Sequence, residues 1–276
     1  MTPRVGTLVV RIDSLEATRP GGWIVTKLLL GTVSAIAMVT SASAADLPAG
    51  PYGKAPVIAA DYDWSGVYLG ANGGWGTSHL CWDFTNAAGV FIVSEGCHDA
   101  AGGTAGGQVG YRWQVAHLVF GAEAQGNWAD FNGSNRSIPF PAFVNATRVD
   151  ALGLFTGQVG VATHNGLFYV KGGAAMTSDR FTGYSSLTGV QVSDTVDNTR
   201  WGAVAGVGLE YGFAANWSAG IEYDHMFMQD KLIAFTNFGT FAPAGTAFAY
   251  DRIHQDVDLL TVRINYRWGG GVLAKY

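Results

Sequence analysis

The sequence predicts an all-β protein, an eight-stranded antiparallel up-and-down β-barrel that crosses a membrane. Three observations lead to this prediction: alternating apolar and polar residues, scarce charge, and tight turns that alternate with long connections. Only 13% of the residues are charged, against about 25% in an average soluble domain. Such a chain has too few charged side chains to cover a large soluble surface, which favours apolar faces that meet lipid.

The N-terminal region carries the features of a secretory signal peptide. A lysine precedes a short apolar stretch at 28–39, and an A-x-A cleavage motif follows at 42–44. We therefore assign residues 1–44 to a signal peptide with an upstream extension. Residues 1–24 have mixed charge and no clear pattern, so we expect a start codon assigned too early, with the true start near Val25.

A linker and a barrel follow the signal. Residues 45–63 contain Pro48, Pro51 and Pro56 among small residues, which predicts an extended periplasmic linker. Residues 64–276 are assigned to the outer-membrane barrel. No stretch of about 18 apolar residues occurs in this part of the chain, so we expect no helical span.

Eight strands are expected from the alternating segments. In chain order they are WSGVYLGANGGWG (64–76), GGQVGYRWQ (106–114), LVFGAEAQGNWA (118–129), ALGLFTGQVGVA (151–162), LFYVKGGAAM (167–176), WGAVAGVGLEYG (201–212), WSAGIEYDHM (217–226) and LTVRINYRW (260–268). In the last segment every second residue from Leu260 to Trp268 is large and apolar, and the residues between are polar. This period of two is that of a strand with one face of each kind.

The connections between these strands are of two kinds. The second and third, fourth and fifth, and sixth and seventh strands are separated by tight turns. The other connections are long, at about 77–103, 130–147, 177–199 and 227–255. Short periplasmic turns and longer extracellular loops are typical of outer-membrane barrels.

The polar faces carry small residues and a few charges, which suit the narrow interior of an eight-stranded barrel. The positive candidates are Arg112, Lys171, Arg263 and Arg267, and the negative candidates are Glu123, Glu210, Glu222 and Asp224. Unpaired charges are costly in a narrow interior. We therefore predict a lumen ionic network that plugs or constricts the barrel. The alternative is a graded pore, in which the same side chains line a conducting path.

Two cysteines, Cys81 and Cys97, fall in the first long connection. In an exported protein an isolated pair predicts a disulfide. A metal site with the neighbouring His79 and His98 is the alternative, although no CxxC motif is present. We predict no metal or cofactor, and no enzymatic activity, because no local signature of a nucleophile and its base occurs.

Several motifs carry a resemblance to a known family. They are AADLP, WSGVYLGANGGWG, GGQVGYRWQ, GLEYGFAANWSAGIEYDH and VRINYRWGGGVLAKY. Together they resemble the small porin-like outer-membrane proteins and surface antigens of alphaproteobacteria, which have an OmpA-like eight-stranded barrel. The resemblance covers residues 45–276 and is weakest in the long connections. It implies an outer-membrane location and roles in envelope integrity and in host or surface interaction.

The expected function is that of an integral outer-membrane barrel with a structural, envelope-integrity and surface-interaction role. Two alternatives stay open: a small-solute diffusion pore, and a surface receptor for haem or another ligand. The expected partners are outer-membrane lipid and lipopolysaccharide, the barrel-assembly machinery, and host or surface ligands at the loops. A formal net charge of -5 argues against nucleic acid as a partner.

Overall fold

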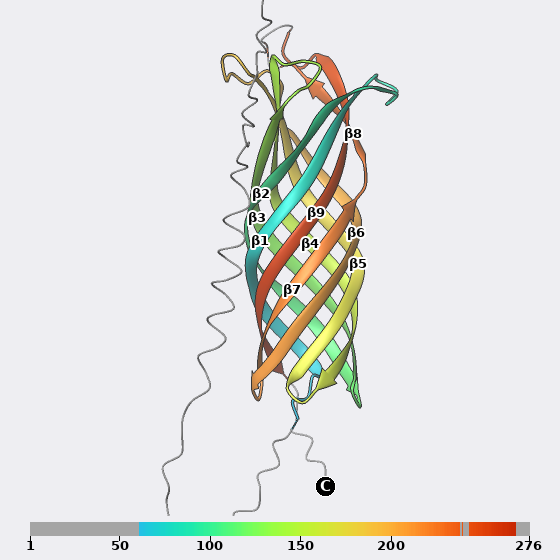
Figure 1. Ribbon diagram of the computed structural model, residues 1–276, viewed down its shortest axis with the longest axis vertical. Coiled ribbons are helices and arrows are strands. Elements are labelled where there is room, and N and C mark those ends of the chain that lie inside the picture. Colours follow the sequence, from blue (N-terminus) through green and yellow to red (C-terminus); the bar gives the residue numbers. More distant parts are fainter. Residues whose placement is uncertain (1–60, 238, 240–242, 269–276) are drawn as a thin grey trace, which may run out of the picture. The chain divides into compact units, whose positions relative to one another are not determined.

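The computed structural model describes residues 61–237, 239 and 243–268, which form a closed antiparallel β-barrel (Figure 1). The strands are β1 (Gly66–Thr85), β2 (Phe91–Val115), β3 (Leu118–Arg136), β4 (Phe143–Thr163), β5 (Gly166–Ser185), β6 (Val196–Ala214), β7 (Trp217–Met228), β8 (Lys231–Thr236) and β9 (Ala247–Trp268). The predicted signal peptide and most of the predicted linker lie outside the described residues. Within the described residues, no helix has the length and apolar character needed to cross a membrane.

The barrel has eight strand positions although the described residues form nine strands. Each strand pairs with the next along the chain as far as β7, and β9 closes the cylinder by pairing with β1. The other edge of β9 pairs with β7 over one half and with β8 over the other. β7 and β8 therefore share one position, interrupted at residues 229–230. The predicted antiparallel up-and-down barrel is confirmed.

The two ends of the barrel differ. At the end that we call the turn end, two-residue turns join β2 to β3, β4 to β5 and β6 to β7. Ala116 and His164 have positive φ angles of 56° and 51° in two of these turns, the backbone twist that tight hairpins favour. Longer connections lie at the opposite end, the loop end, at 86–90, 137–142 and 186–195, and the chain between β8 and β9 leaves and re-enters the barrel at the same end.

The prediction of four long connections is wrong in extent, because most of those residues belong to strands. β1 continues to Thr85 and β2 begins at Phe91, where the sequence predicted one connection over 77–103. On β1 the alternation is reversed at 79–83, where apolar residues face inward, whereas on β2 Glu95 and His98 are buried and Phe91 and Ile92 are exposed. On β1, for example, Leu80 and Trp82 are buried, whereas His79, next to Leu80 in the chain, is exposed.

A belt of apolar side chains covers the outside of the barrel nearer the turn end. On β3 the belt runs from Leu118 to Trp128, and on β9 from Trp268 to Leu260. Its height of about ten residues per strand matches the hydrocarbon thickness of a bilayer. Large exposed members include Leu69, Trp75, Trp113, Phe155, Phe168, Trp201, Leu209, Ile221, Phe227 and Ile264. The outward direction predicted for the apolar residues is confirmed.

Charged side chains begin on the outer surface directly beyond this belt. Arg148 pairs with Asp130 at 3.1 Å and with Asp150 at 2.8 Å, and Arg180 pairs with Asp150 at 2.9 Å and with Asp197 at 3.0 Å. These groups lie on β3, β4, β5 and β6. The change from apolar to ionic residues marks the edge of the belt that is nearer the loop end.

The interior is filled by three layers. Nearest the turn end, Tyr62 and Trp64 pack against Val119, Leu167 and Tyr169. An ionic layer follows, and an apolar cluster fills the loop-end half of the barrel. The members of this loop-end cluster include Leu80, Trp82, Phe131, Leu154, Phe181, Met226, Phe235 and Val257. The expectation of a polar interior therefore holds only at the level of the belt.

Candidate functional site

The ionic layer gathers side chains from six strands at the level of the apolar belt. Its members are Arg112 on β2, Glu123 on β3, Lys171 on β5, Glu210 on β6, Glu222 and Asp224 on β7, and Arg263 on β9. Each lies on the inward face of its strand because side chains alternate with a period of two. The layer holds three cationic and four carboxyl side chains, all buried.

Arg263 joins carboxylates from two strands that are not neighbours. Its Nη2 lies 2.6 Å from Oε2 of Glu123, and its Nη1 pairs with Oε2 of Glu222. The same Nη1 donates to the hydroxyl of Tyr169 at 2.9 Å. Planar guanidinium groups suit such forked contacts. Arg263 thus ties β3 and β7 together across the lumen.

Lys171 supplies the second positive charge at the centre of the layer. Its Nζ lies 2.7 Å from Glu222, 3.3 Å from Asp224 and 3.6 Å from Glu123. One ammonium group therefore lies among three carboxyl groups. A compact, flexible cation is suited to several partners at once.

Arg112 forms the third ionic contact, on the side of β6. Its Nη2 donates to Glu210 at 2.9 Å and to Gln158 at 3.3 Å. Its guanidinium carbon lies 4.4 Å from the centre of the Tyr68 ring, within the range of cation–π contacts. Glu210 also accepts hydrogen bonds from Ser218 and, at 2.8 Å, from Asn265.

Two tyrosines that were not predicted from the sequence complete the layer. The hydroxyl of Tyr68 donates to Glu123 at 2.7 Å, and that of Tyr169 donates to Glu222 at 2.6 Å. Facing glycines leave room for the rings: a Cβ atom on Gly110 would overlap Tyr68, and one on Gly208 would overlap Tyr169. Glycine and tyrosine residues at inward positions of neighbouring strands could have indicated this fit from the sequence.

A chain of amide side chains continues the polar level on the loop-end side of the ions. Asn127 donates to Asn72 at 2.6 Å, Asn72 to Gln108 at 2.7 Å, and Gln108 to Asn265 at 2.7 Å. Gln125 donates to Asn127 at 3.0 Å. These buried amides bind one another, and Oε1 of Gln125 alone among them has no hydrogen-bond partner in the described residues.

Arg267 lies apart from the rest of the predicted network. It is 3.7 Å from Asp63 and donates to the backbone carbonyls of Ser65, at 2.8 Å, and Ala215, at 3.2 Å. Its guanidinium also lies 5.0 Å from the Tyr62 ring centre. Arg267 therefore fastens the segment before β1 to the turn end and does not contact the carboxylates of the ionic layer.

A second buried ion pair lies within the loop-end cluster and was not predicted. Nε of Arg200 on β6 lies 3.5 Å from Asp179 on β5, and Nη1 donates to the carbonyl of Ile253 at 2.9 Å. That carbonyl is on β9 beside the interruption between β7 and β8. Arg200 thus contacts the β9 backbone at the point where β9 stops pairing with β7 and pairs with β8 instead. Its sequence neighbourhood gave no sign of this role.

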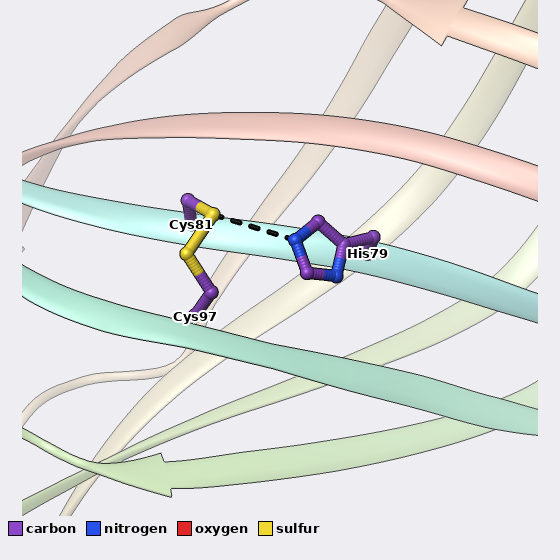
Figure 2. A group of neighbouring side chains, drawn as sticks. All are labelled: His79, Cys81 and Cys97. Carbon is purple, nitrogen blue, oxygen red and sulfur yellow. Dashed lines mark hydrogen bonds between the residues drawn. A yellow bond between two sulfur atoms is a disulfide. The ribbon is translucent and has the colours of Figure 1, made fainter.

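Cys81 and Cys97 lie opposite each other on β1 and β2, on strands and not in a loop (Figure 2). They form a disulfide with a Cα–Cα distance of 4.1 Å. His79 lies beside them, with its Nε2 3.6 Å from Sγ of Cys81 and its Nδ1 2.6 Å from Asp99. A metal at this group would require thiolates, and both sulfurs are joined to each other. His98 points inward, to Asn135 and Thr147.

The closed strand order, the apolar belt and the buried ionic layer define a transmembrane β-barrel. Residues 31–244 match the family described as outer membrane protein beta-barrel domain. The chain belongs to this family, and the family implies the outer membrane, where such barrels contact lipid and lipopolysaccharide.

One named relative is an uncharacterized protein of Coxiella burnetii, 28% identical over 72% of this chain and 84% of its own. Similar solved structures include OprG of Pseudomonas aeruginosa (12% identity, 75% of this chain and 98% of that one, TM-score 0.48). Ail of Yersinia pestis (11%, 74% and 99%, TM-score 0.38) and the protease OmpT of Escherichia coli (9%, 74% and 97%, TM-score 0.40) are also similar. Kinship with alphaproteobacterial surface antigens stays a prediction.

Proposed function

We propose that this outer-membrane barrel is closed to solutes and serves a structural role in the envelope, with its loop end available for interactions outside the cell. In this proposal the lumen ionic network holds the wall together and blocks the lumen. The turn end faces the periplasm, as the short turns and the exported N-terminal side predict. No catalytic role is assigned to the chain.

One observation carries the proposal, the burial of the ionic layer. The paired side chains of Arg112, Lys171 and Arg263 and their carboxylate partners expose at most 3% of their surface. A lumen wide enough for water would leave such side chains accessible to it. The packing supports a plug and disfavours the small-solute pore.

A second barrier supports the same conclusion. Phe131, Phe181 and Val257 of the loop-end cluster come from different strands and are 0% exposed. Water and ions would have to pass an apolar layer as well as the ionic one, at a high desolvation cost. Opening either layer alone should therefore leave the barrel closed.

Single-channel recording in planar bilayers tests this proposal. Wild type, Arg263→Ala and Phe131→Ala are each expected to give no stable open steps. The combined Arg263→Ala, Phe131→Ala variant is expected to leak, because both layers then contain a gap. Folding of each variant is checked by heat-modifiable migration on a gel. Stable open steps from folded wild-type protein would contradict the proposal.

A further inference from the structure

A cavity of about 250 Å³ lies at the loop end of the barrel, above the loop-end cluster. Six aromatic residues contribute to its lining: Trp82, Phe84, Phe140, Phe143, Phe235 and Phe248. Trp82 and Phe235 stack with ring centres 5.4 Å apart, and Phe84 meets Phe140 edge to face at 5.5 Å. Pockets that bury drug-sized ligands measure about 300–1,000 Å³, so this cavity suits a small molecule.

Two carboxyl groups also face this aromatic cavity. Glu95 on β2 and Asp251 on β9 both line it, and they are 6% and 4% exposed. Oε2 of Glu95 accepts a hydrogen bond from Asn145. Oδ1 of Asp251 accepts no hydrogen bond from any residue that the structure describes. A buried acceptor without a partner is costly, and here it borders an open space.

Burial acts on both acids, and the charges of neighbouring acids act on Asp251 as well. Burial, and after it the charges of Glu95 and Asp83, raise the pKa of Asp251 to about 8. Burial likewise raises the pKa of Glu95. Two nearby carboxyl groups with raised pKa values are stabilised in their ionised form by a cation placed between them. The cavity therefore holds two acids whose ionised forms have no counter-charge among the described residues.

The basic side chains around the cavity do not supply that charge. Arg252 follows Asp251 but donates to the carbonyl of Gly89 at 2.8 Å. Burial lowers the pKa of His98, which keeps this ring neutral near pH 7. Arg200 is engaged with Asp179, and Lys231 is exposed. Neither Glu95 nor Asp251 forms an ion pair with a residue in the described ranges.

We propose that this cavity binds a small organic cation, an ammonium group carried on an apolar or aromatic body. Aromatic rings attract a cationic group, and six of them line the cavity, while Glu95 and Asp251 neutralise its charge. A neutral apolar molecule would give the ionised acids no counter-charge, and an anion would be repelled by them. A bare divalent metal ion prefers oxygen ligands and would make no use of the six aromatic rings in the lining. The site does not depend on closure of the lumen.

Binding of benzyltrimethylammonium to the full chain in lipid nanodiscs, measured by calorimetry, tests the proposal. Neopentylbenzene has the same shape with a neutral carbon in place of the nitrogen, and serves as the matched ligand. The cation is expected to bind and the neutral molecule to bind at least about tenfold more weakly. Equal binding of the two probes would overturn the proposal, and so would absence of binding by the cation.

Isosteric variants locate the site. Asp251→Asn and Glu95→Gln should each weaken binding of the cation about tenfold. Asp256→Asn removes the same charge from the outward face of β9 and should change binding less than about twofold. Wild-type binding should also tighten from pH 6 to pH 9 as Asp251, whose pKa is about 8, ionises. Equal effects of Asp251→Asn and Asp256→Asn in folded protein, or weaker binding at pH 9, would overturn the assignment.

Discussion

At the scale of single residues, the lumen is governed by what each inward side chain meets. Tyr68 and Tyr169 reach their carboxylates because glycines face their rings. Arg263 is tolerated in the interior because two carboxylates and a hydroxyl accept from it. Small and large residues on neighbouring strands are therefore matched in size, so that a substitution at one inward position alters the packing of its partner.

Gly208→Ala tests the fit around Tyr169. The added methyl group would overlap the ring, so we expect a loss of about 1–3 kcal/mol in unfolding free energy. Gly126→Ala is the matched control, because a Cβ atom at Gly126 would meet nothing within 4 Å. Unfolding by guanidinium in micelles, followed by tryptophan fluorescence, gives the comparison. Equal midpoints for the two variants would refute the proposed fit.

Arg263→Met tests the pairing in the ionic layer. It leaves Glu123 and Glu222 with one fewer cation in a buried site, and we expect a loss of about 3–5 kcal/mol in unfolding free energy. Arg180→Met removes a half-exposed outer cation and should cost about 0–1 kcal/mol. Adding Glu123→Gln and Glu222→Gln to Arg263→Met should recover part of the loss. No recovery would show that charge pairing is not the cause.

Asp251 gives the stability a predictable dependence on pH. Its pKa is about 8 in the folded protein and 3.8 in a model peptide. Because the folded protein holds the proton more tightly, stability is highest below pH 4 for this group and declines as pH rises to about 8. Asp251→Asn should therefore unfold at a higher temperature than wild type at pH 9. Asp256→Asn should behave as wild type, and a wild type that gains stability from pH 5 to pH 8 would contradict the assignment.

At the scale of strands, the sequence predicted the apolar belt well and the loop-end extensions poorly. Within the belt, outward residues such as Val109 and Leu209 are large, and inward ones are small or polar, so the alternation was clear. Beyond the belt, charged residues lie on the outer surface, and the apolar residues Leu80 and Trp82 face inward. The pattern of apolar residues outside and polar residues inside is reversed there. A period of two does not state which face is inside, so these stretches resembled loops.

The disulfide joins β1 and β2 in one of these extensions, beyond the belt. Replacing Cys81 and Cys97 by serine should therefore lower protection from hydrogen exchange at residues 78–85 and 91–98. Closing a loop of this size contributes about 3 kcal/mol in the chain-entropy view. Residues 118–128, within the belt, should keep their protection and serve as the internal control. Uniform loss of protection along the barrel would contradict this local role.

At the scale of the whole molecule, most of the ionic layer followed from the sequence, and its surroundings did not. Arg112, Glu123 and Arg263 were identified because charges are rare on strands of this kind. Arg200 with Asp179 and the cavity acids Glu95 and Asp251 were missed, because they lie where the sequence suggested loops. Which charges meet depends on the register between strands that are distant in sequence, and one chain does not reveal that register.

The central claim is that apolar side chains meet lipid while the lumen is packed. Nitroxide labels at each position from 260 to 268, in a background without Cys81 and Cys97, test it by collision with oxygen and with a water-soluble nickel complex. We predict oxygen contact peaking at the even positions, and shielding from both reagents at the odd ones. Nickel contact at the odd positions would reveal a water-filled lumen, and nickel contact at the even positions would place the apolar face in water.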